Sequence, residues 1–197
     1  MGTFKQLCEG DPDVDNTKTE DAMKLLSFPE LRQIFTFDCG ACAGCCVLAY
    51  YGVDVREEWF MKFAGTTKKN GTYVAGMVKA IEYFGLTTTH GENMTIPQIR
   101  AGIDHGYPAI LSIQAYHELM VPYADDWDDG HFVVAIGYNK NHIYFEDPAS
   151  YTRTWLSNKE LEERWHDTDE KNKKIHNWAC IVKGKPRYRR NESAHMD

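Results

Sequence analysis

Residues 33–52 read QIFTFDCGACAGCCVLAYYG, and this segment decides how the chain folds. It opens with β-forming aromatic residues, passes through a Cys-Gly step into a run of small residues, and ends at a glycine. The pattern predicts extended chain up to Phe37, a buried helix from about Gly40 to Tyr51, and a stop at Gly52. Cys39 then lies at the helix N-terminus, where unpaired N–H groups favour a thiolate, so it is a candidate nucleophile.

Length and composition exclude several classes of protein. The 197 residues suit one domain of ordinary size, and 43% hydrophobic residues supply a core. A net charge of -7 argues against a nucleic-acid partner, which would need a basic face. No apolar run is long enough to predict a membrane segment, and the N-terminus has no apolar signal core.

The six cysteines point to a reducing compartment. Four of them crowd into eight positions, whereas a disulfide framework spaces its cysteines along the chain. Without a secretion signal, we expect free thiols and a cytoplasmic location.

The chain divides into an arm, a domain and a tail. We expect an N-terminal arm over residues 1–28, mobile up to about Thr19 and then a short helix over 19–26. The domain takes residues 29–183, and the basic tail, residues 184–197, is expected to be disordered.

Helices come first within the domain and strands follow. Helices are predicted at 55–63, 73–84 (capped by Thr72), 95–104 and 157–165, and the last two begin with capping boxes. Strands are predicted at 86–89, 108–114, 131–138, 142–146 and 177–182, with a charged loop over 166–174. This order indicates an α+β fold, with the helices packed on one side of an antiparallel sheet.

The groups that a cysteine protease needs occur at sensible places. His131 follows Gly130 at the start of a central strand, Asp147 closes the returning strand, and Gln33 lies six residues before Cys39. Together they could supply a base, a group that orients the base, and a donor to an oxyanion. Each pattern also has a plain structural reading: a strand edge, an Asp-Pro turn and a surface glutamine.

Three blocks in order resemble the bacteriocin-processing peptidase family. The blocks are residues 33–52, residues 130–138 and Asp147-Pro148, and the likeness covers roughly residues 30–183. Members of this family are papain-like cysteine peptidases, best known as domains of ABC exporters that cut leader peptides after a double glycine. Since no membrane segments or nucleotide-binding domain follow, the chain looks like a free-standing member.

The resemblance implies a papain-like fold and a role for each residue. Cys39 would be the nucleophile, His131 the general base and acid, and Asp147 the group that orients His131. Gln33 and the backbone N–H of Cys39 would hold the oxyanion. The implied reaction is hydrolysis of a peptide bond through a thioester, with a Gly-Gly-like junction as a candidate site and with no cofactor or metal.

The partner that these expectations imply is a peptide or protein substrate. Asp38, Gly130 and Trp127 are expected to contact it, the last from the acidic segment 125–129 at the rim of the active site. The sequence does not define the oligomeric state.

Other functions stay open at this point. The same three groups could serve an amidase, a deamidase or an acyl transferase, and the fold could be a non-catalytic peptide-binding module. Cys39, Cys42 and Cys45 could be metal ligands or a redox pair. The simpler interpretation makes Cys42, Cys45 and Cys46 small buried residues. His166 is a weaker candidate base, because its neighbours predict a charged loop.

Overall fold

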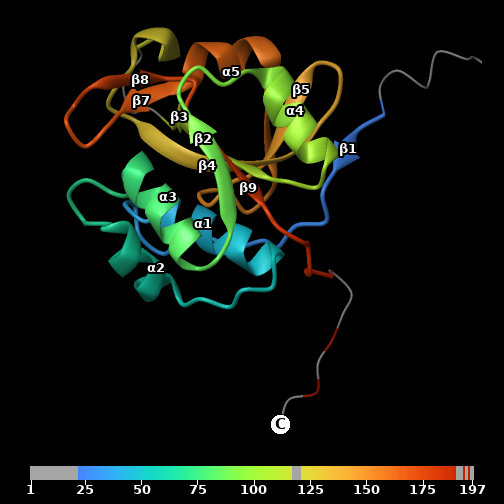
Figure 1. Ribbon diagram of the computed structural model, residues 1–197. Helices are drawn as coiled ribbons and strands as arrows, with labels where there is room; N and C mark the ends of the chain where they lie inside the picture. The colour runs from blue at the N-terminus through green and yellow to red at the C-terminus, as the bar shows by residue number, and fades with distance from the viewer. Residues whose placement is uncertain (1–21, 117–120, 190–192, 194, 196–197) are drawn as a thin grey trace, which may run out of the picture.

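The structure is a computed structural model that describes residues 22–116, 121–189, 193 and 195 (Figure 1). The predicted mobile arm up to Thr19 lies outside the described residues, as does Cys8.

An antiparallel sheet forms the centre of the molecule. Its strands run in the order β2-β9-β3-β4-β5-β6, and β1 pairs with the far end of β4. A separate two-stranded sheet contains β7 and β8. The strands are β1 Lys24–Leu25, β2 Thr87–Gly91, β3 Ala109–Gln114, β4 Gly130–Tyr138, β5 His142–Glu146, β6 Thr154–Ser157, β7 His166–Thr168, β8 Lys174–His176 and β9 Ala179–Lys183.

Helices cover both faces of this sheet. They are α1 Cys39–Tyr50, α2 Glu57–Ala64, α3 Val74–Tyr83, α4 Ile96–Asp104 and α5 Asn158–Arg164, with a 3-10 turn at Tyr123–Asp125. In Figure 1, α1, α2 and α3 lie below the sheet, and α5 lies above it. The predicted α+β class is confirmed.

The predicted one-sided packing of the helices is wrong. Phe132 and Val134 belong to the core between the sheet and α1, α2 and α3. Val133 and Ala135 belong to a second core, with residues of α4 and α5. Successive side chains of a strand point to opposite faces, so a strand that is apolar at every position needs cover on both.

Helix α1 is buried along nearly its whole length, which explains its run of small residues. A Cβ atom on Gly44 would lie 2.1 Å from the Phe60 ring, so only glycine lets α2 approach this closely. The prediction of a helix here is confirmed. Cys42, Cys45 and Cys46 are all buried, which confirms that they are packing residues.

The predictions of local structure failed at four short strands. Lys24–Leu25 is a strand paired to β4 rather than part of a helix. The segment predicted as a charged loop contains β7 and β8, and β6 was not predicted at all. These strands are short and polar, so their own sequence carries little periodicity.

Two smaller predictions also need correction. Tyr73, not Thr72, occupies the N-cap position of α3, and the Thr72 hydroxyl is paired with that of Thr66 at 2.7 Å. Residues 34–37 form a bend and turn rather than extended chain, because Asp38 accepts hydrogen bonds from the backbone of Ile34 and Phe35.

The described start of the C-terminal tail packs on the domain. The N–H groups of Arg187 and Tyr188 donate to the Tyr50 carbonyl at 3.0 and 3.1 Å. Tyr188 also packs against the core that contains the buried residues of α1. The domain boundaries at residues 28 and 183 stay predictions.

Replacing Gly44 tests the close packing of α1. Alanine normally favours a helix by about 1 kcal/mol over glycine, but here its Cβ would overlap the Phe60 ring. We expect Gly44→Ala to lower the free energy of unfolding by about 1–3 kcal/mol in urea denaturation. Adding Phe60→Leu should recover part of the loss, and a Gly44→Ala protein more stable than wild type would contradict the packing argument.

Candidate active site

Cys39 is the first residue of α1, and the loop before it is held by Asp38. The Asp38 carboxylate is 1% exposed and accepts from the backbone N–H of Ile34 at 3.3 Å and of Phe35 at 3.0 Å. It makes no side-chain cap to the helix. Asp38 therefore fixes the loop next to the thiol. Although it was predicted to contact the substrate, it does not line the cavity that contains Cys39.

The β4–β5 hairpin brings His131 and Asp147 together. Val134 pairs with Glu146, so the residue after β5 returns beside the first residues of β4. His131 Nε2 lies 2.8 Å from Asp147 Oδ1, and both side chains are buried. Because Nε2 is engaged by the carboxylate, Nδ1 is the nitrogen left for proton exchange with a thiol.

The surroundings of His131 favour its charged form. Burial opposes the imidazolium, but hydrogen bonds with Asp147 and Cys39 outweigh burial and raise the pKa of His131 to about 9. For Asp147, burial acts to raise the pKa, yet hydrogen bonds from His131, Tyr116 and the Ala149 N–H hold it below its ordinary value. Cys39 thus contributes to the raised pKa of His131. Such a pair suits a thiol that gives its proton to an imidazole.

Tyr116 completes this arrangement and was not predicted. Its hydroxyl donates to Asp147 Oδ2 at 2.6 Å, and its ring meets the His131 ring edge-on at 5.4 Å. The backbone has a φ of 60°, an unusual value for a residue other than glycine. A tyrosine at the start of a long connection carries no sequence signal for this contact.

A buried ion pair ties the loop before Cys39 to the strand before Asp147. Glu146 is fully buried and pairs with Arg32, while Arg153 lies 3.8 Å from its second oxygen. The Gln33 N–H also donates to the Pro148 carbonyl at 3.0 Å. These contacts hold residues 32–33 against the end of β5.

Gln33 lies near the site, but its amide points elsewhere. Its Nε2 donates to the Phe35 carbonyl at 2.7 Å, within its own loop. In this conformation the side chain does not line the cavity that contains Cys39.

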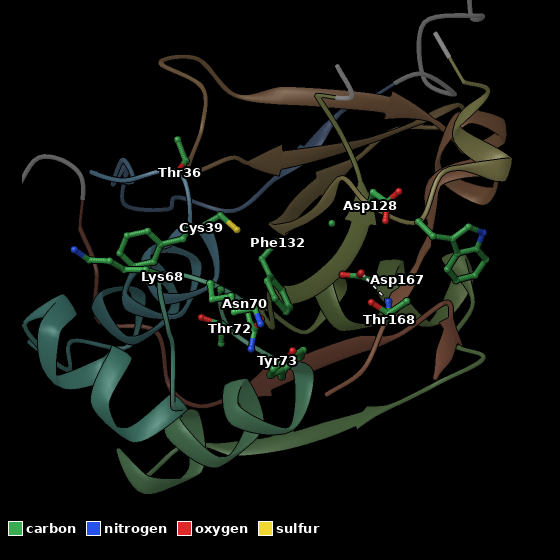
Figure 2. Close-up of a pocket in the computed structure, with 15 residues that line it drawn as sticks. Thr36, Cys39, Lys68, Asn70, Thr72, Tyr73, Asp128, Phe132, Asp167 and Thr168 are labelled. Carbon is green, nitrogen blue, oxygen red and sulfur yellow. Dashed lines mark hydrogen bonds between the residues drawn. The ribbon is translucent and has the colours of Figure 1, made fainter. Parts of the chain in front are cut away.

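Cys39 opens onto a cavity of about 560 Å³, and Figure 2 shows it facing this space. The cavity brings Cys39 together with Gly130 and Trp127, both predicted as substrate contacts. Most other lining residues are polar or charged, among them Asp128, Asp167, Lys68, Asn70 and Thr72. Of these five, only Asp128 belongs to the segment that the sequence predicted at the rim of the active site.

His166, the weaker candidate base, is used elsewhere. It is buried on β7, its Nε2 lies 2.6 Å from the Asp126 carbonyl, and its ring packs at a tilt of 42° against the Trp127 ring, with the centroids 4.3 Å apart. It therefore supports the acidic segment at the rim of the cavity.

Metal and membrane sites find no support in the described part of the chain. There, no three His, Cys, Asp or Glu side chains are grouped as metal ligands. None of the helices within residues 22–116 and 121–189 is long and apolar enough to span a membrane.

Comparisons with known proteins identify a family and similar folds. Residues 27–168 match the model of the peptidase C39 family. A protein described as a C39-like peptidase from Bacillus anthracis has 14% identity and a TM-score of 0.65, covering 85% of this chain and 100% of its own. The peptidase domain of Streptococcus ComA, a bifunctional ABC transporter, has 19% identity and a TM-score of 0.57, with coverage of 79% and 97%.

A third solved structure contains a peptide. It is a double-glycine-motif protease from an AMS/PCAT transporter in complex with the leader peptide, at 19% identity and a TM-score of 0.57, with coverage of 82% and 94%. No curated protein matches the chain in sequence. The family match and the fold define a papain-like cysteine peptidase. The chain belongs to the peptidase C39 family.

The titration of His131 tests the electrostatics of the pair. We expect an NMR pKa near 9 for its ring protons, against an ordinary value of 6.5, and a lower pKa in Asp147→Asn. Because the folded pKa is raised, the stabilisation of about 3 kcal/mol is present in full below about pH 6.5 and is lost as pH rises through about 9. His105→Asn, at an exposed position, should leave both the titration and this pH dependence unchanged.

Proposed function

We propose that the chain hydrolyses a peptide bond with Cys39 as nucleophile, His131 as general base and acid, and Asp147 as the group that orients His131. The observation that carries this proposal is the buried 2.8 Å contact between His131 and Asp147, next to a thiol at the start of α1.

The reaction follows from these positions. Cys39 Sγ attacks the scissile carbonyl carbon after its proton has passed to His131. The tetrahedral intermediate collapses to a thioester while His131 protonates the leaving amine. Water then attacks the thioester and gives its proton to His131. The carboxylic acid product leaves as the Cys39 thiol is restored.

The oxyanion needs donors beside Cys39. The first N–H groups of a helix have no partner within that helix, which makes the N–H of Cys39 one donor. Gln33 supplies the second when its amide turns from the Phe35 carbonyl toward the substrate. The short loop 33–38, which is held by Asp38 and by the Pro148 carbonyl, joins Gln33 to the residue before the thiol and supports this proposal.

A peptide with a Gly-Gly-like junction is the proposed substrate. The fold shared with a double-glycine-motif protease in complex with its leader peptide supports a peptide ligand. Thr36, Phe37, Asn70 and Thr72 line the same polar cavity as Cys39, which is the proposed site for the peptide.

Activity measurements test the roles of Cys39 and His131. Digestion of a peptide library that includes Gly-Gly junctions should give cleavage that Cys39→Ser abolishes. His131→Ala should lower kcat/KM by roughly 10²–10⁴-fold, because proton transfer is lost.

Labelling of thiols separates the enzyme from a non-catalytic module. Iodoacetamide near neutral pH should modify the wild-type protein quickly, Cys39→Ser slowly, and Cys46→Ser as quickly as wild type, because Cys46 is fully buried. Equal and slow labelling of all three proteins would rule out an activated Cys39. Fast labelling without peptide cleavage would favour an amidase, deamidase or acyl transferase.

Replacement of Gln33 tests the oxyanion site. We expect Gln33→Ala to lower kcat by roughly 10²–10³-fold with little change in KM, because the lost donor acts only on the transition state. Gln33→Glu, which keeps the length but lacks the donor, should lose a similar factor. An unchanged kcat in both variants would remove Gln33 from the mechanism.

A further inference from the structure

Asp167 places a carboxylate in the wall of the active-site cavity. It lies on β7 and is half-buried. Ser112 Oγ donates to its Oδ2 at 2.5 Å, and the Thr168 N–H donates to its Oδ1 at 2.7 Å. Two ionised oxygens offer about four acceptor positions, so this carboxylate has capacity left for a ligand.

Gly130 allows this carboxylate to lie against the start of β4. A Cβ atom at Gly130 would be 2.8 Å from both oxygens of Asp167. The carboxylate therefore touches the backbone of the residue that precedes His131. Figure 2 shows Asp167 and Cys39 on opposite sides of Phe132, all three around the same cavity.

Within the part of the chain that the structure describes, the positive group that acts on Asp167 is the neighbouring His166 ring rather than a lysine or arginine. Of the lysine and arginine side chains that the structure describes, none forms an ion pair with it. Burial raises its pKa above the ordinary value, although Ser112 and Thr168 donate to it. Asp128 adds a second carboxylate to the cavity lining, whereas Lys68 lies on the side of Cys39 in Figure 2.

We propose that Asp167 is a specificity residue that binds a positively charged group of the peptide substrate, close to the scissile bond. The charged group is a Lys or Arg side chain or a free α-amino group, and all three donate charge-assisted hydrogen bonds to a carboxylate. This inference rests on the proposed peptidase function and adds a substrate class to it.

Profiling of cleavage sites tests the proposal. Wild-type protein, Asp167→Asn and Asp169→Asn are each incubated with the same diverse peptide library, and the cut sites are read by mass spectrometry. Asn keeps the shape of Asp167 and one of its two acceptor oxygens. Asp169→Asn is the matched control, because it removes the same charge two residues away and does not line the cavity.

We expect wild type and Asp169→Asn to enrich a cationic group at one fixed position within about three residues of the cut. In Asp167→Asn this preference should fall by about tenfold or more. A parallel library with acetylated N-termini separates the sources: loss of the preference on acetylation identifies an α-amino group, and its retention identifies Lys or Arg. Wild-type cleavage without a cationic preference, or a preference that survives in Asp167→Asn, would overturn the inference while leaving the peptidase function intact.

A second measurement does not depend on cleavage. Cys39 is modified with aminoethyl methanethiosulfonate, which is cationic, and with sulfonatoethyl methanethiosulfonate, which is anionic, and Cys39→Ser gives the background from other thiols. The ratio of cationic to anionic rate constants should fall several-fold in Asp167→Asn and not in Asp169→Asn. If no library peptide is cut, the proposed function fails, and an unchanged ratio would then also refute cation binding at Asp167.

Discussion

The contact between His131 and Asp147 is the interaction on which the rest of the structure depends. An imidazolium and a carboxylate removed from water are stable only when their remaining hydrogen-bonding positions are filled. Here Asp147 also accepts from Tyr116, Thr154 and the Ala149 N–H. These donors come from three separate segments. The position of one carboxylate therefore depends on the register of β4 and β5 and on the conformations of two loops.

The position of Cys39 at the start of α1, in contrast, depends on close packing rather than on charge. Gly40 lets the start of α1 sit against Thr72 and Phe132, and Gly44, one turn later, lets it sit against Phe60. The first turn of the helix therefore reaches the start of β4, where the cavity begins. Asp38 holds the preceding loop from inside, and Glu146 with Arg32 joins that loop to the end of β5. Thiol and imidazole therefore come from separate layers, which the contacts of residues 32–33 with the end of β5 hold together.

The elements that could be predicted from the sequence are those whose signal is local. The glycine-flanked helix after Cys39, the capping boxes at Thr95 and Ser157, and the β4–β5 hairpin are each written in a few neighbouring residues, and the structure contains all of them. The sequence did not predict β7 and β8, a short polar hairpin with little periodicity, or β1, which exists only because the distant strand β4 pairs with it. For the same reason the sequence could not show Tyr116 on Asp147 or Asp167 over Gly130. Each contact joins residues far apart along the chain and has no short motif.

The contact of the tail with Tyr50 has a mechanical consequence. Helix α1 spans 12 residues, so it acts as a rod about 18 Å long, with the sulfur at one end and the Tyr50 carbonyl at the other. Arg187 and Tyr188 clamp that far end, while the Asp38 loop clamps the near one. Axial sliding of the rod would move Cys39 away from His131 by the same amount. The smallest unit that keeps the thiol aligned therefore extends past the last strand, β9, to Tyr188.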